Sequence, residues 1–128
     1  MRILLAEDDP VNRLIVERML RRAGHEVICA ANGQEAVDKA SREGFDLILM
    51  DCEMPVLDGC EAARLIREQE GVGCRTLILA LTAHAGDSDR ELFLASGMDG
   101  VIAKPFDMGH FERLLRSLHT CDSANAEC

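Results

Sequence analysis

The chain has 128 residues, of which 48% are hydrophobic, which suits one domain with one buried core and excludes a disordered chain. Its formal net charge of −9 argues against nucleic acid as a partner, because nonspecific nucleic-acid binding needs a basic surface. No apolar stretch approaches the length of a membrane span, and the N-terminus lacks the layout of a signal peptide. We therefore expect a cytoplasmic protein without membrane contact.

The six cysteines occur at spacings that are typical of neither a zinc site nor a redox pair, and we expect them to be reduced and structural.

The first two predicted elements are a strand over residues 2–6 and a helix over residues 10–23. Asp9 is a suitable N-cap for this helix, Pro10 suits its first turn, and Gly24 is placed to end it. Apolar side chains recur at helical spacing, at Val11, Ile15, Met19 and Ala23.

The later elements continue the same alternation of strand and helix. The predicted strands are residues 26–30, 46–50, 76–81 and 100–103, and the predicted helices are residues 34–42, 60–69 and 106–119 and a fourth helix that ends near Ser96. Asn32-Gly33 predicts a turn, Asp58-Gly59 leads into the third helix, and Asp87 or Ser88 is expected to cap the fourth. Residues 1–119 thus form one domain, and residues 120–128 predict a polar tail or the start of a linker.

Five successive strand–helix units favour an α/β fold, a doubly wound five-stranded parallel sheet with helices on both faces. Strands that are buried on both faces are typically continuous apolar runs, and residues 46–50 and 76–81 are such runs.

Reactive side chains follow four of the five predicted strands: Glu7 and Asp8, Asp51, Thr82, and Lys104. Because ligands of open α/β sheets bind outside the carboxyl ends of the strands, we expect these residues to share one site. Clustered carboxylates repel one another unless a cation joins them, and Mg²⁺ prefers oxygen ligands. Asp51 could then attack phosphorus, while Lys104 and Thr82 hold the phosphoryl oxygens. A cis Lys104-Pro105 bond is a further hypothesis.

Each of these residues also has an ordinary structural explanation, such as a helix cap, a turn or a strand-forming hydroxyl. Taken singly, those explanations are the better ones. Occurring together at matching strand ends, the residues favour a shared site.

These positions resemble those of the response-regulator receiver domain, the CheY-like phosphoacceptor module, over about Arg2 to His119. The supporting motifs are Glu7-Asp8-Asp9-Pro10-Val11-Asn12, Asp51, Met54-Pro55-x-x-Asp58-Gly59, Ala80-Leu81-Thr82-Ala83-His84-Ala85 and Lys104-Pro105-Phe106. The motifs that begin at Glu7 and at Ala80 look most like those of receivers in hybrid sensor histidine kinases. The chain is then a stand-alone receiver or part of such a kinase.

The resemblance implies the strand order 2-1-3-4-5 of flavodoxin-like sheets. It also implies that Asp51 accepts a phosphoryl group from a histidine kinase or a histidine phosphotransfer domain, with Mg²⁺ bound by Glu7, Asp8, Asp51 and the backbone carbonyl of Glu53. Such a domain is no ordinary enzyme, although it catalyses its own phosphorylation and dephosphorylation. The phosphotransfer partner would dock on helix 10–23, near Leu14. Homodimers would form through the face made by residues 87–96, 100–103 and 106–119.

One position departs from the family pattern. Val101 stands where the family often has Tyr or Phe, so an aromatic rotamer switch cannot operate there. Signalling would then rest on Thr82 and residues 83–88, or the domain would pass the phosphoryl group on without a large switch.

Three other classes compete with this interpretation. A phosphatase with an aspartyl nucleophile would typically have a second Asp two residues after the first, where this chain has Glu53. A flavodoxin-like cofactor binder would have a Ser-, Thr- and Gly-rich first loop instead of Glu7-Asp8-Asp9. A pseudo-receiver that only binds partners would not need the complete acid, Thr and Lys set.

Overall fold

The computed structural model describes residues 1–52, 54, 57–70, 76–83 and 86–122. It contains all ten predicted elements in alternating order. The strands are β1 (Arg2–Ala6), β2 (Glu26–Ala30), β3 (Leu47–Asp51), β4 (Leu77–Thr82) and β5 (Gly100–Ala103). The helices are α1 (Pro10–Arg22), α2 (Gly33–Arg42), α3 (Gly59–Gln69), α4 (Asp87–Ala95) and α5 (Met108–Asp122).

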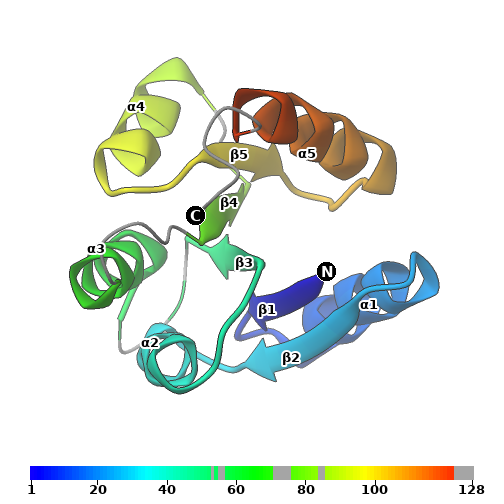
Figure 1. The fold of residues 1–128 in the computed structure, drawn as a ribbon, viewed down its shortest axis with the longest axis horizontal. Coiled ribbons are helices and arrows are strands. Elements are labelled where there is room, and N and C mark those ends of the chain that lie inside the picture. The colour runs from blue at the N-terminus through cyan, green and yellow to red at the C-terminus, as the bar shows by residue number, and fades with distance from the viewer. Residues whose placement is uncertain (53, 55–56, 71–75, 84–85, 123–128) are drawn as a thin grey trace.

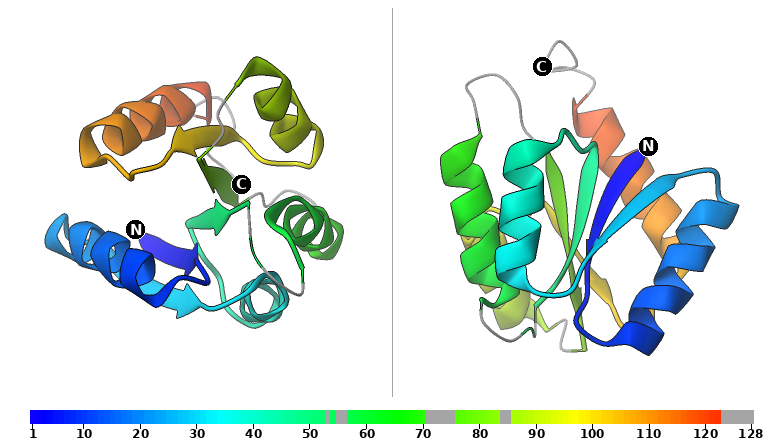
Figure 2. Two further views of the ribbon diagram at one scale, coloured as in Figure 1. Left: turned by 180° about the vertical axis from the view of Figure 1, so that it is seen from behind. Right: turned by 90° about the horizontal axis from the view of Figure 1, so that it is seen from below.

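The strands form one parallel sheet in the order β2-β1-β3-β4-β5, which confirms the doubly wound fold (Figure 1). Helices α1 and α5 cover one face, and α2, α3 and α4 cover the other, so the molecule has three layers (Figure 2). None of the helices in the described ranges is long and apolar enough to cross a membrane.

Alternate strand residues enter two separate cores, one on each side of the sheet. In β3, Leu47 and Leu49 pack with the buried side chains of α1 and α5, whereas Ile48 and Met50 pack with those of α2, α3 and α4. Successive side chains of a strand point to opposite faces, so a strand covered on both faces must be apolar throughout. This requirement explains the continuous apolar runs, and it leaves polar side chains to the strand ends.

Side-chain caps begin α1, α2 and α3. Asp9 Oδ1 accepts from the Val11 amide at 3.0 Å, as predicted, and Asp58 Oδ1 accepts from the Glu61 amide at 2.9 Å. Asn32 Oδ1 accepts from the Glu35 amide at 2.8 Å, so the predicted turn is in fact the cap of α2.

The prediction for the start of α4 was wrong. Its N-cap is Gly86 in extended conformation, without a side-chain cap hydrogen bond, and Asp87 is already helical. The structure also places the start of α5 at Met108 rather than at residue 106. The carboxylate of Asp107 accepts from the Gly109 amide at 2.9 Å, which sets that start.

The apolar spacing noted in α1 does not mark its buried face. Val11 and Ile15 are 65% and 51% exposed, whereas Val16 and Leu20 are buried against the sheet. The two sets have similar spacing and differ mainly by a rotation about the helix axis, which only packing decides. The first turns of α1 therefore present apolar side chains to solvent.

Candidate functional site

The reactive side chains predicted from the sequence lie at the carboxyl edge of the sheet. Asp51 is the last residue of β3 and Thr82 is the last residue of β4. Each strand therefore ends one residue later than predicted. Glu7 and Asp8 directly follow β1, and Lys104 directly follows β5. The ladder continues past the strands, since the Lys104 amide donates to the Thr82 carbonyl at 2.8 Å. This pairing fixes where the Lys104 side chain begins.

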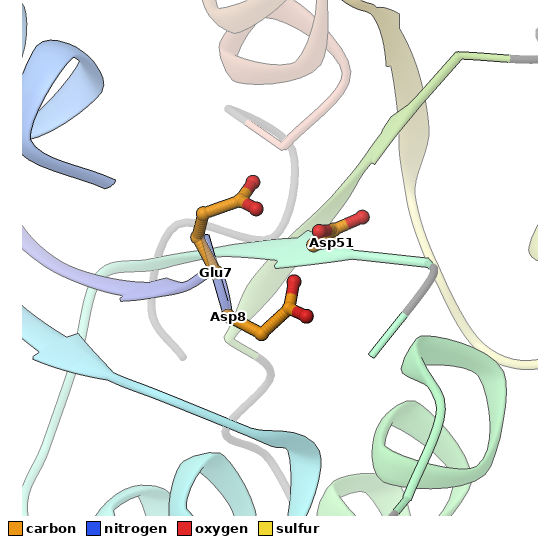
Figure 3. A group of neighbouring side chains, drawn as sticks. All are labelled: Glu7, Asp8 and Asp51. Carbon is orange, nitrogen blue, oxygen red and sulfur yellow. The ribbon is translucent and has the colours of Figure 1, made fainter. Parts of the chain in front are cut away.

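Three carboxylates meet at this edge (Figure 3). One oxygen from each of Glu7, Asp8 and Asp51 lies within 4.8 Å of the other two. Glu7 and Asp51 are buried, and Asp8 is exposed. The cluster thus has a dry inner side and one acid that is open to solvent.

Lys104 is the cation of the site. Its Nζ lies 3.1 Å from Asp51 Oδ1 and 3.5 Å from Glu7 Oε2. The peptide bond between Lys104 and Pro105 is cis, as hypothesised from the sequence. The ammonium group compensates part of the negative charge that the buried pair of acids brings together.

Burial and the neighbouring Asp51 raise the pKa of Glu7 from 4.5 to about 7, against the opposing effect of Lys104 and of the Asp9 amide. Burial on its own would lower the pKa of Lys104, but hydrogen bonding and attraction to Asp51 and Glu7 outweigh it, so the pKa is raised. Lys104 therefore stays charged, while Glu7 keeps its proton to a higher pH than an ordinary glutamate when no further cation is present.

The donor set suits a hard divalent cation. It offers carboxylate oxygens alone, and hard cations such as Mg²⁺ take oxygen ligands from one or two carboxylates together with water. The pKa of Glu7 is raised chiefly by burial, and the hydrogen bond and charge of Asp51 add to the rise.

The other predicted positions have separate outcomes. Thr82 is 2% exposed, at the end of the strand next to β3. Val101 is buried with Phe93 and Met98 in the core beneath α4. Its side chain is aliphatic, so no aromatic ring can rotate at this position. Glu53, whose carbonyl is an expected ligand, lies outside the described residues, and so does His84.

A pocket beside the site was not foreseen from the sequence. It has a volume of about 360 Å³ and lies between α1 and the residues that follow β5. Its lining residues are Glu7, Asn12, Ile15, Val16, Leu81, Lys104, Pro105 and Phe106. The sequence carried no signal for it, because the spacing of Ile15 does not show whether that side chain is buried or exposed.

Gly59 has a role that its turn motif did not reveal. A Cβ atom added to Gly59 would lie 2.6 Å from the Asp51 carbonyl oxygen and 2.9 Å from Cys52 Cα. The first residue of α3 therefore touches the backbone of the strand end that carries Asp51, and only glycine leaves room for this contact.

A doubly wound sheet with acids at the carboxyl ends of its first and third strands and a lysine at that of its fifth defines the receiver class of phosphoacceptor domains. The chain belongs to the family described as response regulator receiver domain, whose sequence model matches residues 3–116. The resemblance stated from the sequence is thereby confirmed.

Relatives of known description are sensor and hybrid kinases. The chain is 42% identical over 106 residues to the sensor protein GacS of Pseudomonas syringae pv. syringae, which covers 81% of this chain and 12% of that protein. It is also 42% identical over 110 residues to hybrid signal transduction histidine kinase G of Dictyostelium discoideum, covering 84% of this chain and 3% of the kinase. The chain thus spans only a small part of these relatives.

Two solved structures are informative. The receiver domain of sensor histidine kinase PA1611 from Pseudomonas aeruginosa PAO1 has a TM-score of 0.81 and 49% identity, with 91% of this chain and 94% of that chain covered. That structure has a magnesium ion in its active-site cleft. The Saccharomyces cerevisiae Ssk1 receiver, in complex with the phosphotransfer protein Ypd1, has a TM-score of 0.80 and 32% identity, covering 88% of this chain and 83% of that chain.

Proposed function

We propose that this receiver domain accepts a phosphoryl group from a phosphohistidine onto Asp51 and so switches or relays a signal. The observation that carries the proposal is the contact of Lys104 Nζ with Asp51 and Glu7, beside Asp8, at the carboxyl edge of the sheet. A structural ion pair would not need three convergent acids. A nucleophile that receives a dianionic group does need neighbouring positive charge.

Mg²⁺ is the proposed cofactor. Asp8 and Asp51 would hold it directly, Glu7 would reach it mainly through water, and the Glu53 carbonyl would complete the set of protein ligands. When bound, the ion neutralises negative charge on the site and on the entering phosphoryl group. The magnesium ion of the PA1611 receiver supports this choice.

Asp51 would act as the nucleophile. One carboxylate oxygen forms a bond to phosphorus, the bond between phosphorus and the histidine nitrogen breaks, and the electron pair of that bond stays on the imidazole. Lys104 would hold a phosphoryl oxygen and leave Asp51 free to react. The Thr82 hydroxyl would bind a second phosphoryl oxygen, so both residues stabilise charge that spreads during the transfer.

The donor would be a histidine kinase or a histidine phosphotransfer domain, as in the complex of Ssk1 with Ypd1. Its docking surface would be the apolar patch of Val11, Leu14 and Ile15, which are 65%, 48% and 51% exposed at the start of α1. Patches of this kind mark interaction sites, and this one lies directly beside the acids. The neighbouring pocket at Ile15 and Phe106 would receive an apolar side chain of the partner.

The remaining properties follow from this role. The domain, residues 1–119, would work in the cytoplasm and bind neither nucleic acid nor membrane. Residues 120–128 would be a tail or linker, although α5 extends into them as far as Asp122. It would catalyse its own phosphorylation and hydrolysis of the product.

With Val101 in place of an aromatic side chain, the response would run through Thr82 and the segment before α4. Two copies would pair through α4, β5 and α5.

A pseudo-receiver that only binds partners is the main alternative. A domain that only binds partners does not need a lysine 3.1 Å from a buried aspartate, and the burial of each charge is costly. The complete acid and lysine set therefore favours the phosphoacceptor.

Transfer from a protein donor tests the proposal. A phosphotransfer protein labelled on histidine with ³²P should lose its label to this chain, and the Asp51→Asn variant should take up none. Transfer to Asp51→Asn at the rate of the unmodified chain would sink the assignment. Undetectable transfer to both, together with tight binding of the donor, would favour the pseudo-receiver.

A further inference from the structure

The backbone on either side of Glu7 is fixed by two hydrogen bonds. The Glu7 amide donates to the Ala30 carbonyl of β2 at 3.1 Å. The Glu7 carbonyl accepts from Nη1 of Arg13, a half-buried residue of α1, at 3.1 Å. The first bond continues the sheet beyond β1. The second is a side-chain contact from a residue six positions further along the chain.

Asp8, by contrast, has no hydrogen bond or ion pair with any residue in the described ranges. Its carboxylate nevertheless lies with those of Glu7 and Asp51. Its direction must therefore be set by the peptide groups that flank it. The preceding peptide includes the Glu7 carbonyl, which the Arg13 guanidinium holds. In the following peptide the Asp9 amide donates to Glu7 Oε1 at 3.3 Å, and the Asp9 carbonyl accepts from the Arg13 backbone amide at 2.9 Å, a bond that does not depend on the Arg13 side chain.

We infer that Arg13 is a positioning residue for the metal site, because its guanidinium fixes the Glu7–Asp8 peptide and so aims the Asp8 carboxylate at Asp51. The inference rests on the proposed function, in which Asp8 and Asp51 hold Mg²⁺. Arg13 itself touches only backbone at this loop, so it acts through Asp8. Partners of this kind behind a metal ligand restrict its orientation before the ion arrives.

The charge of Arg13 and its hydrogen bond have opposite effects on cation binding. The guanidinium donates to the Glu7 carbonyl and adds positive charge to the loop that carries Asp8, so removal of the charge alone would strengthen Mg²⁺ binding. Removal of the hydrogen bond frees the Glu7–Asp8 peptide and weakens Mg²⁺ binding. The direction of change in an Arg13→Ala variant therefore separates positioning from simple electrostatics.

Calorimetric titration with Mg²⁺ alone tests the inference on the 128-residue chain. Arg13→Ala should raise the Mg²⁺ dissociation constant about tenfold, the lower end of the range for such supporting contacts. Arg13→Lys keeps one donor and should recover binding to within about threefold of the unmodified chain. Arg18→Ala is the matched control, because Arg18 is exposed on the same helix and has no partner within the described ranges.

The defect should also be confined to metal binding. Labelling of Arg13→Ala by acetyl phosphate should be slow at low Mg²⁺ and should match the unmodified chain once Mg²⁺ is saturating. Urea midpoints of the variants without Mg²⁺ report separately on folding. An unchanged or smaller dissociation constant in Arg13→Ala would overturn the inference, and so would a labelling defect that persists at saturating Mg²⁺.

The proposed function fails in a distinguishable way. In that case the unmodified chain itself would show neither Mg²⁺ binding nor labelling, and the inference would fall with it.

Discussion

Lys104 Nζ lies 3.1 Å from Asp51 Oδ1, although the two residues end strands that are not neighbours. β4 separates β3 from β5, so the Lys104 side chain reaches across the end of β4. Asp51 is almost fully buried, whereas the Lys104 side chain is 27% exposed. The lysine therefore closes a buried acid site from its solvent side and stands where an incoming anion would meet it.

Lys104→Ala should separate anion stabilisation from metal binding. Without the ammonium group, labelling of Asp51 by acetyl phosphate should fall about 100-fold, the usual cost of losing one donor to a developing charge. The Mg²⁺ dissociation constant should stay equal or fall, because a competing cation has left the acids. Intact mass spectrometry over time and calorimetric titration give the two values.

Lys39→Ala is the control for that experiment. Lys39 pairs with Glu35 on α2 at 3.0 Å and donates to the Cys29 carbonyl of β2, and because neither partner is one of the three clustered acids, its loss should change neither value. If Lys104→Ala lost Mg²⁺ binding and labelling to the same extent, the main role of Lys104 would be to hold the fold.

Gly59→Ala should damage the site through the backbone of Asp51. The added methyl group would meet the Asp51 carbonyl oxygen at 2.6 Å, so α3 or the end of β3 must move. We expect a loss of about 2 kcal/mol in the free energy of unfolding and a weaker Mg²⁺ complex. Urea denaturation and calorimetry measure both.

Gly44→Ala supplies the comparison, because a Cβ atom at Gly44 meets nothing within 4 Å. Its unfolding free energy should stay within about 0.5 kcal/mol of the unmodified chain. Equal stability of the two variants would contradict the close contact at Gly59.

Glu7 should make the metal-free domain less stable as the pH rises. Its pKa is about 7 in the folded chain and 4.5 as an ordinary value, so between these pH values the folded state binds more protons than the unfolded state. The stabilisation is complete below pH 4.5 and is lost as the pH passes through 7. We expect a decline on the order of 2 kcal/mol, measured as urea midpoints in EDTA.

Glu7→Gln cannot ionise and should remove this decline, so the difference between the two chains isolates Glu7 from other titrating groups. Saturating Mg²⁺ should also flatten the dependence, since the ion favours the deprotonated acid. A decline of the same size in Glu7→Gln would assign it to another residue.

Leu14→Glu should impair transfer from a phosphotransfer protein without changing the chemistry at Asp51. Leu14 is 48% exposed on the apolar patch of α1, where a buried contact with a partner would lose 1 kcal/mol or more, roughly fivefold to tenfold in affinity. Leu92→Glu on α4, at 52% exposure, is the matched control for an exposed apolar residue outside the donor-docking surface, although it lies on the proposed dimer face. Both variants should be labelled normally by acetyl phosphate. Equal transfer to both would place the docking surface elsewhere.

The fold could be predicted from the sequence because strand ends and helix starts carry local signals. The apolar run at Leu47–Met50, the cap at Asp9 and the glycine at Gly24 each depend on neighbours in the chain. The grouping of the acids with Lys104 was also predictable, because parallel strands bring their carboxyl ends to one edge.

Features that depend on packing could not be read in the same way. Which face of α1 is buried depends on how the helix rotates against the sheet, and the spacing of Val11 and Ile15 fits either outcome. The contacts of Arg13 with the Glu7 carbonyl and of Gly59 with the Asp51 backbone join segments through space. No pattern of residue types along the chain encodes these distances.

Intact mass measured after incubation with a small phosphodonor tests the central claim most directly. With acetyl phosphate or phosphoramidate and Mg²⁺, the chain should gain one phosphoryl group, and the gain should vanish in EDTA and in Asp51→Asn. A single adduct that requires Mg²⁺ and is absent from Asp51→Asn would establish Asp51 as the acceptor. An adduct that persists in Asp51→Asn, or no adduct under any condition, would contradict the account.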